Sequence, residues 1–259
     1  MKNIFKKTIF ILVFIFLFFL LLVLSNYVYT CFLNKLFVEN SNKKVEEIFT
    51  IDKIVLFSSC SAESNINSNT TTTINNLFQY TDIAIFINNS GDDFSLENTL
   101  KSVSIRDISF NTTPSLGTPK LYYKSLTSFA TSNIVDDNLI SSNLDFAISS
   151  EDEADYSKPV LFNNCANPIT LSYVNTNIIN EYTIPNSSIT YDGSLLKKGN
   201  VLLNDIECKF SFTIYIENNL GETLRCPVYI SIPLQDSSYS IYDGIYTCTY
   251  NPNYVFHTY

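Results

Sequence analysis

An unbroken run of sixteen apolar residues, from Ile9 to Leu24, is the first feature of the hydrophobic pattern. About 20 residues of helix cross the hydrocarbon core of a bilayer, and flanking residues extend the run to that length. At roughly −0.3 to −0.6 kcal/mol per apolar residue, insertion is favourable by about 5 to 10 kcal/mol. A buried core helix is the alternative, but soluble folds rarely hold a helix that is apolar on every side. The pattern predicts a transmembrane helix over residues 8–30.

The charges around this run predict its direction. Lys2, Lys6 and Lys7 precede it without any acid, which favours a cytoplasmic tail over residues 1–7 and an exterior C-terminal part. A cleaved signal peptide is the alternative, but it needs small residues at the cleavage site, and no alanine occurs before Ala62. Lipidation of Cys31 would also need a small residue just before the cysteine. We therefore expect an uncleaved, single-pass anchor.

Two segments near the C-terminal end alternate strictly between apolar and polar residues. Apolar side chains occupy every even position over residues 206–216 and again over residues 224–232, which is typical of half-buried strands. The sequence ENNLG between them predicts a hairpin with a five-residue loop that pairs Ile216 with Glu222. In that register Cys208 and Cys226 lie four residues apart along the ladder. That separation, about 13 Å, is too long for a disulfide.

Shorter patterns of the same kind predict further strands between the anchor and this hairpin. They cover residues 51–58, 80–87, 103–110, 120–123, 144–148, 159–162, 169–174, 178–182 and 201–203. The polar tract over residues 61–76 holds few apolar side chains, so we expect a long exposed loop there. Residues 96–101 predict a short helix. Residues 31–50 predict a juxtamembrane stalk, either a helical extension or an irregular linker.

Many short strands, turn signals between them and little helix indicate a mainly β fold. We expect the N-terminal transmembrane helix to be followed by an extracytoplasmic antiparallel β-sandwich over residues 51–259, immunoglobulin-like or similar. Two small sandwiches that join near residue 151, where the acidic sequence EDEAD begins, are the alternative. No internal repeat is evident.

Charge narrows the range of partners. All 25 acidic residues and 13 of the 16 basic residues follow the anchor, so the exterior part has a net charge of −12. This balance argues against nucleic acid and anionic lipid surfaces as partners. Asparagine is abundant, and Asn69, Asn88, Asn111 and Asn186 head N-x-S/T triplets that matter only in a host that glycosylates exported asparagines.

Catalytic motifs are missing from the sequence. The single histidine, His257, cannot supply a zinc site of several histidines, and neither a G-x-S-x-G elbow nor a Walker loop occurs. Acidic residues could hold calcium or act as a carboxylate pair, although solvated surface acids are the simpler interpretation. These candidates are Asp92, Asp93, Asp136, Asp137, Glu151, Asp152, Glu153 and Asp155. We predict no cofactor and no catalytic residue.

Cysteines and tyrosines provide the remaining candidates. The six cysteines form no C-x-x-C pair, and the exterior location permits disulfides. Cys226 and Cys248 are a candidate disulfide if the segment between them loops back beside its own strand; buried, reduced thiols are the alternative. Tyrosines crowd the C-terminal end, where Tyr242, Tyr246 and Tyr250 are a candidate interaction face. An ordinary strand exterior is the simpler interpretation of these rings.

These observations favour a membrane-anchored extracytoplasmic protein with a non-enzymatic interaction or envelope-structural role. Its expected partners are the membrane, through the N-terminal helix, and a protein or surface polymer. An exported hydrolase that uses paired carboxylates is one alternative. An accessory subunit of a membrane complex is another, although the helix carries no G-x-x-x-G motif and no polar intramembrane residue.

Overall fold

The structure is a computed structural model that describes residues 48–67, 70–90, 95–124, 138–186 and 189–259. The predicted cytoplasmic tail (1–7), the transmembrane helix (8–30) and nearly all of the stalk (31–50) lie outside these residues. Within the described ranges, no helix has the length and apolar content that crossing a membrane requires.

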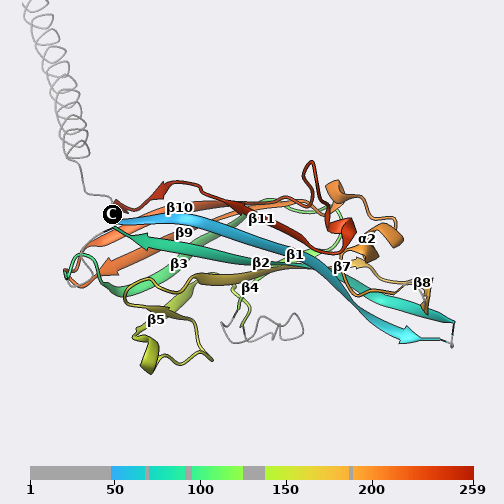
Figure 1. The fold of residues 1–259 in the computed structure, drawn as a ribbon, viewed down its shortest axis with the longest axis horizontal. Coiled ribbons are helices and arrows are strands. Elements are labelled where there is room, and N and C mark those ends of the chain that lie inside the picture. The colour runs from blue at the N-terminus through green and yellow to red at the C-terminus, as the bar shows by residue number, and fades with distance from the viewer. Residues whose placement is uncertain (1–47, 68–69, 91–94, 125–137, 187–188) are drawn as a thin grey trace, which may run out of the picture. The chain divides into compact units, whose positions relative to one another are not determined.

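Two β-sheets make up the described part of the chain, which confirms the predicted mainly β class (Figure 1). Sheet A has the order β11 (Tyr246–Tyr250), β1 (Phe49–Ile66), β2 (Thr71–Asn89), β7 (Ile169–Ile179) and β4 (Thr118–Tyr123), with β12 (Tyr254–Val255) beside β1 and β8 (Tyr182–Pro185) beside β2. Sheet B has the order β13 (His257–Thr258), β10 (Thr223–Ile232), β9 (Cys208–Asn218), β3 (Leu100–Thr112), β5 (Leu144–Ser149) and β6 (Val160–Phe162). Neighbouring strands are antiparallel except for β5 and β6, which are parallel.

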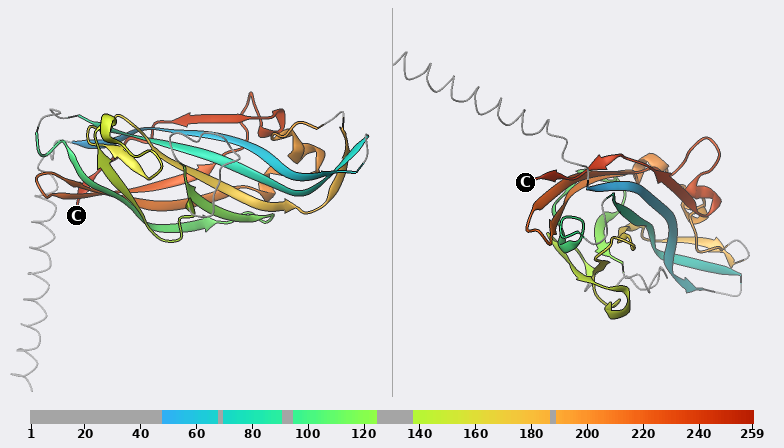
Figure 2. Two further views of the ribbon diagram at one scale, coloured as in Figure 1. Left: turned by 90° about the horizontal axis from the view of Figure 1, so that it is seen from below. Right: turned by 60° about the vertical axis from the view of Figure 1, so that its left-hand side comes forward.

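The two sheets face each other across one hydrophobic core (Figure 2). Along β9 and β10 every even position is buried, as the alternation predicts. Tyr173 of sheet A stacks on Phe210 of sheet B, with ring centroids 6.1 Å apart and ring planes 9° from parallel. Each large apolar side chain buried in this way contributes roughly 1.5 to 3 kcal/mol of transfer free energy. Burial between the sheets therefore stabilises the described domain.

Strands from both sides of residue 151 are neighbours in each sheet. β2 pairs with β7 in sheet A, and β3 pairs with β9 in sheet B. The acidic residues Glu151–Glu153 form a short 3-10 helix on the connection between β5 and β6. Both sheets are thus continuous across this point of the sequence.

The β9–β10 hairpin forms as predicted, but its loop is shorter than the five residues we expected. Asn218 closes the loop by donating its backbone N–H to the Glu222 carbonyl, which leaves three loop residues. Gly221 takes a left-handed φ of +91°, the conformation that a three-residue hairpin loop needs at its last position. Ile216 consequently pairs with Leu224 instead of Glu222.

This register places Cys226 opposite Ile214, six positions along β9 from Cys208. The separation is about 20 Å at ~3.3 Å per residue. Both thiols are free, which agrees with the prediction that Cys208 and Cys226 do not form a disulfide.

The polar tract over residues 61–76 is not the exposed loop that we predicted. β1 and β2 continue as paired strands through this region, from Ser61 opposite Phe78 to Ile66 opposite Thr72. Figure 1 shows β8 beside the far end of this hairpin, where it pairs with residues 71–74 of β2. The third strand and a buried Ile74 supply the packing that composition alone did not indicate.

Smaller differences concern the short elements. Residues 95–99 form turns instead of the predicted helix, and β3 begins at Leu100. The predicted strand over residues 201–203 is not formed: residues 201 and 202 have no regular structure, and Leu203 begins a 3-10 helix, Leu203–Asp205. A turn divides the predicted strand over residues 178–182 between β7 and β8. The described residues also include α2 (Ser194–Lys198) and a 3-10 helix over Ile241–Asp243.

Candidate functional site

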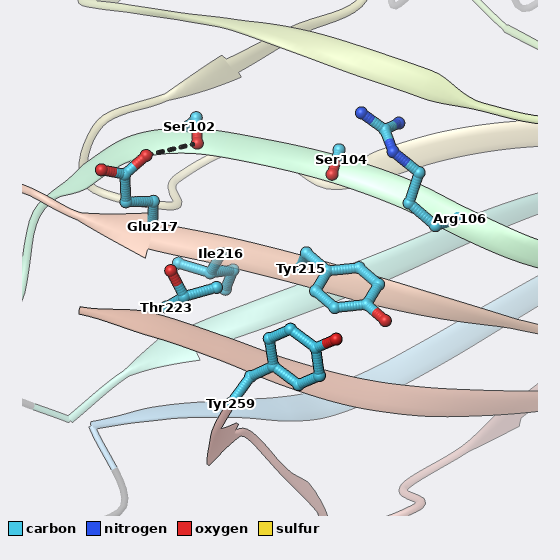
Figure 3. Close-up of a pocket in the computed structure, with 8 residues that line it drawn as sticks. All are labelled: Ser102, Ser104, Arg106, Tyr215, Ile216, Glu217, Thr223 and Tyr259. Carbon is cyan, nitrogen blue, oxygen red and sulfur yellow. Dashed lines mark hydrogen bonds between the residues drawn. The ribbon is translucent and has the colours of Figure 1, made fainter. Parts of the chain in front are cut away.

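A pocket of about 340 Å³ lies on the outer face of sheet B (Figure 3). Its wall comes from three adjacent strands, β3, β9 and β10, and from Tyr259 just beyond β13. The lining residues are Ser102, Ser104, Arg106, Tyr215, Ile216, Glu217, Thr223 and Tyr259. Hydroxyl groups predominate, beside one guanidinium and one carboxylate.

The period of two along the strands explains why these polar side chains meet. Val103 and Ile105 point into the core, so Ser102, Ser104 and Arg106 project outward. The same rule turns Tyr215 and Glu217 of β9 toward solvent, because their even-numbered neighbours are buried. Burial of the inner face therefore positions the pocket residues on the other side.

Strand register aligns four side chains in one row across sheet B. Ser104 pairs with Tyr215, Tyr215 pairs with Arg225, and Arg225 pairs with His257. Directly opposed residues of antiparallel strands share a face. The chain has two arginines, Arg106 and Arg225, and one histidine, and this face carries all three.

Two tyrosine rings form the aromatic side of the pocket. Tyr215 and Tyr259 meet edge to face, with centroids 5.6 Å apart and planes at 82°. The Arg225 guanidinium lies 4.7 Å above the Tyr259 ring, within cation–π range. Tyr259 is anchored by its backbone N–H, which donates to the Thr223 carbonyl at 2.9 Å. The Tyr215 hydroxyl donates to Asp107 at 3.2 Å, which fixes the direction of that ring.

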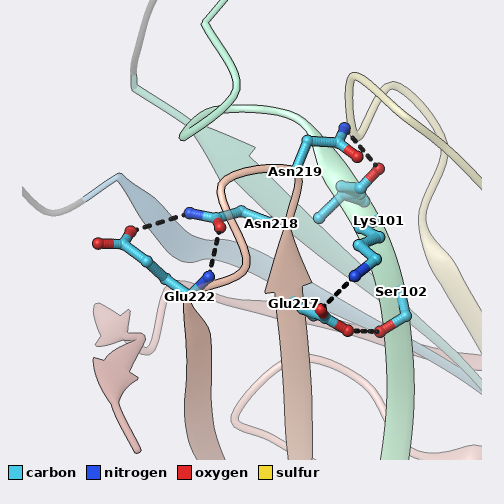
Figure 4. Close-up of polar contacts among 7 residues, drawn as sticks. Lys101, Ser102, Glu217, Asn218, Asn219 and Glu222 are labelled. Carbon is cyan, nitrogen blue, oxygen red and sulfur yellow. Dashed lines mark hydrogen bonds and ion pairs between the residues drawn. The ribbon is translucent and has the colours of Figure 1, made fainter.

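Glu217 forms the acidic end of the pocket. Lys101 Nζ donates to its carboxylate at 2.6 Å, and the Ser102 hydroxyl donates at 3.4 Å (Figure 4). The hydrogen bond from Lys101 is the main cause of a lowered pKa for Glu217, so this carboxylate stays ionised at neutral pH. It can accept hydrogen bonds but cannot donate a proton.

The loop beside Glu217 is tied to the strand across from it. Asn218 accepts from the Glu222 N–H at 2.8 Å and donates to the Glu222 carboxylate at 3.0 Å. The Asn219 side chain donates to the Thr99 hydroxyl at 2.8 Å, and its backbone N–H donates to the Thr99 carbonyl at 3.1 Å. The Asn218–Glu222 contacts, drawn in Figure 4, close the β9–β10 loop, and the Asn219 contacts join this loop to Thr99 at the start of β3.

Arg106 forms the basic end. It makes an ion pair with Asp145 of β5 and donates to the carbonyls of Ile105 at 3.0 Å and Leu144 at 3.4 Å. Both lining charges, Arg106 and Glu217, are therefore already paired within the protein. Arg225 differs, because its contact in the described chain is the Tyr259 ring and no ion pair.

In the acidic segment after residue 150, the carboxylate of Asp155 contacts residues of its own turn. Asp155 accepts from the Ser157 hydroxyl at 2.5 Å and forms an ion pair with Lys158 at 3.0 Å. These contacts, the hydrogen bond from Ser157 first, lower the pKa of Asp155 to about 2. In the described ranges no three His, Cys, Asp or Glu side chains come close enough to hold a metal ion. The other acidic candidates, Asp92, Asp93, Asp136 and Asp137, lie outside those ranges.

The tyrosines predicted as an interaction face point largely inward. Tyr246 is 3% exposed, and its burial raises the pKa of its hydroxyl to about 12. Tyr242 donates its hydroxyl to the Val201 carbonyl, and Tyr250 packs against the core. The strand β11 pairs with β1 at the edge of sheet A, and this pairing directs Tyr246 and Tyr250 toward the core, whereas Tyr242 belongs to the 3-10 helix Ile241–Asp243 and packs against the core from there.

The candidate disulfide between Cys226 and Cys248 is not formed. Cys226 pairs with Ile214 in sheet B, whereas Cys248 pairs with Leu56 in sheet A, and both thiols are free. The prediction needed the segment after β10 to return beside β10. Instead it carries the chain to the other sheet. Burial raises the pKa of the Cys226 thiol to about 12, so it is protonated and unreactive at neutral pH.

None of the protein families, curated proteins and solved structures compared with this chain matches it. Function must therefore be argued from the chemistry of the site. Sequence reasoning did not select the pocket residues. The signal that could have found them is the placement of both arginines at outward positions of strands with strict alternation.

Proposed function

We propose that this protein is a membrane-anchored, extracytoplasmic binding protein without catalytic activity, and that the pocket on sheet B contacts its ligand. The observation that carries this proposal is the composition of the pocket. Five hydroxyl side chains, two of them on adjoining aromatic rings, line a single hollow beside both arginines of the chain. Ligand sites commonly combine such polar groups with aromatic surface.

The location follows from the sequence. The apolar run over residues 9–24 and the preceding lysines favour a transmembrane helix with its N-terminus in the cytoplasm. The two facing sheets then form an extracytoplasmic antiparallel β-sandwich that presents the pocket to the exterior. The acidic balance of this domain suits solubility and disfavours nucleic acid as a ligand.

Binding is favoured over hydrolysis because Glu217 is the single acid among the lining residues, and the nearby carboxylates of Asp107 and Asp145 are already bonded to Tyr215 and Arg106. A hydrolase of the paired-carboxylate type needs a second acid about 5 to 9.5 Å away, one of the two being protonated. Glu217 is the carboxylate of the lining, and its contact with Lys101 keeps it ionised. Such a site can orient a ligand without supplying a general acid.

Crosslinking in the native membrane tests this proposal. The full-length protein is crosslinked to its surroundings, and captured protein and polymer are compared with those from the double variant Tyr215→Ala/Tyr259→Ala. Tyr229→Ala is the matched control, because Tyr229 is 58% exposed on the same face of β10 but does not line the pocket. We expect the double variant to lose material that the wild type and the control capture. Identical capture by all three, or no capture by the wild type, would contradict the proposal.

A further inference from the structure

We infer that the pocket binds a saccharide that carries a single carboxylate, such as one acidic sugar within or at the end of an otherwise neutral chain. This inference rests on the proposed binding function and names its ligand class. It follows from three observations: the hydroxyl groups of the lining, its two aromatic rings, and the charge of Arg225, which adjoins the lining through its contact with Tyr259 and its pairing with Tyr215.

The hydroxyl groups favour a ligand that both donates and accepts hydrogen bonds at several positions. Ser104 and Thr223 each carry a hydroxyl with one donor and two acceptor lone pairs, and Ser102, whose hydroxyl donates to Glu217, adds acceptor lone pairs. An apolar ligand would displace water from these groups without replacing its hydrogen bonds, which costs about 1 to 3 kcal/mol per unpaired group. The ring hydroxyls of a sugar match this pattern.

The size of the site favours one or a few sugar units over a larger folded partner. Its volume of about 340 Å³ lies near the lower end of the ~300–1,000 Å³ range of ligand pockets. Tyr259 is 74% exposed, so the pocket is open on that side and a longer chain can continue past it. The edge-to-face pair of Tyr215 and Tyr259 forms the aromatic part of the lining, against which the C–H groups of a sugar ring can pack.

Arg225 selects for a carboxylate. Lys101 and Arg106 are already paired with Glu217 and Asp145, whereas Arg225 has no acidic partner within the described chain. The guanidinium carbon lies 4.7 Å from the centroid of the Tyr259 ring, and a contact with a ring face uses none of the N–H groups of the guanidinium. A carboxylate can accept two parallel hydrogen bonds from such an edge.

The charge of the whole domain restricts the ligand further. The net charge of −12 after the anchor repels a polymer with an acid on every unit, just as it repels nucleic acid. An isolated carboxylate is different, because charges beyond the Debye length of about 8 Å are largely screened at physiological salt. The site therefore fits a lone acidic sugar among neutral ones.

Matched oligosaccharides test this inference with the full-length protein in lipid nanodiscs. Each acidic probe, sialyllactose or glucuronosyl-xylotriose, is compared with its neutral parent, lactose or xylotriose, and with an oligogalacturonate. We expect an acidic probe to bind at least about tenfold more tightly than its parent, as one charged bidentate contact warrants. Arg225→Gln should abolish this preference, Tyr229→Ala should keep it, and both variants should melt like the wild type.

The outcomes separate this inference from the proposed function. Equal binding of acidic and neutral probes, or tightest binding of the oligogalacturonate, overturns the single-carboxylate ligand. Failure of every saccharide to bind overturns the saccharide class, while pocket-dependent crosslinking would still support a binding role. If the double variant Tyr215→Ala/Tyr259→Ala captures the same material as the wild type, the proposed function itself is wrong.

Discussion

The two long hairpins of this domain are stabilised in different ways. In β9–β10 the even positions of both strands are buried, and a three-residue loop with Gly221 at positive φ closes the ladder. The far part of β1–β2, over residues 61–76, is polar, and side-chain hydrogen bonds link it to β8. Thr73 bonds to Thr183 at 2.9 Å, and the Thr72 hydroxyl donates to Asn186 at 2.6 Å.

This difference indicates that the β9–β10 hairpin is more stable than the far part of the β1–β2 hairpin. β9 is flanked by β10 and β3 and packs against sheet A, so it cannot open without disrupting the shared core. The far end of β1–β2 depends on a four-residue strand, β8, and on neutral hydrogen bonds whose net contribution is about 0.5 to 1.5 kcal/mol each. We expect the first hairpin to follow global unfolding and the second to open locally.

Phe212→Asp should have the largest effect on this comparison. Phe212 is fully buried in β9, and the substitution combines a cavity with an unpaired buried charge. The cost of about 5 kcal/mol or more is comparable to the stability of a whole domain, so both hairpins should unfold together. Circular dichroism and urea titration measure this result. Thr213→Asp, on the outer face of the same strand, is the control and should stay folded.

A pair of identical truncations sharpens the contrast. Ile214 of β9 and Ile74 of β2 are both fully buried, and each loses the same atoms on substitution by alanine. Ile214→Ala should lower the free energy of global unfolding by about 2 to 5 kcal/mol. Ile74→Ala should lower it less, because the loss is limited to the free energy of opening the far hairpin. Equal decreases in urea-unfolding midpoint for the two variants would falsify separate opening.

The same contrast explains how much of the fold could be predicted from the sequence. Strict alternation from residue 206 onward revealed β9, β10 and their buried face, because burial of one face imposes a period of two. The loop register was wrong by two residues, since the side chain of Asn218 and the φ of Gly221 decide it. Residues 61–76 gave no apolar signal, and their partners in β8 lie about a hundred residues away.

The candidate site was harder to predict than the fold. Tyr242, Tyr246 and Tyr250 were chosen because tyrosines cluster there in sequence, yet Tyr246 is buried, and Tyr242 and Tyr250 are partly buried against the core. Tyr215 and Arg225 are opposite each other through the register of the β9–β10 hairpin, and His257 joins them because the distant strand β13 pairs with β10. Alternation assigns a residue to a face, but only register shows which residues of neighbouring strands are opposite each other.

Thr73→Val tests the hydrogen bonds of the polar hairpin. The substitution keeps the shape of the side chain but removes the hydroxyl that contacts Thr183 and Asn67. We expect a loss of about 1 to 3 kcal/mol, because the partner groups are left unpaired. Hydrogen exchange should show it as lower protection of residues 72–74 with no change in β9. Thr247→Val, at an exposed position of β11, serves as the control, and a loss that spreads to β9 would contradict local opening.

Acid should produce the smallest effect, and it should reach only one of the two hairpins. The pKa of Glu217 is lowered by its contact with Lys101, so the ionised form is favoured in the folded protein. Its stabilising contribution is present above the ordinary glutamate range and is lost as the pH falls through the lowered pKa. The hydroxyl–amide contacts of the far β1–β2 hairpin carry no charge, so their stability should not depend on pH.

Hydrogen exchange measures this difference through protection factors, which correct for the intrinsic pH dependence of exchange. The protection factor should decrease on acidification at Asn219, whose N–H bonds to Thr99, and remain constant at residues 72–74. Glu217→Gln should remove the pH dependence at Asn219; its persistence in that variant would assign the effect to another acid.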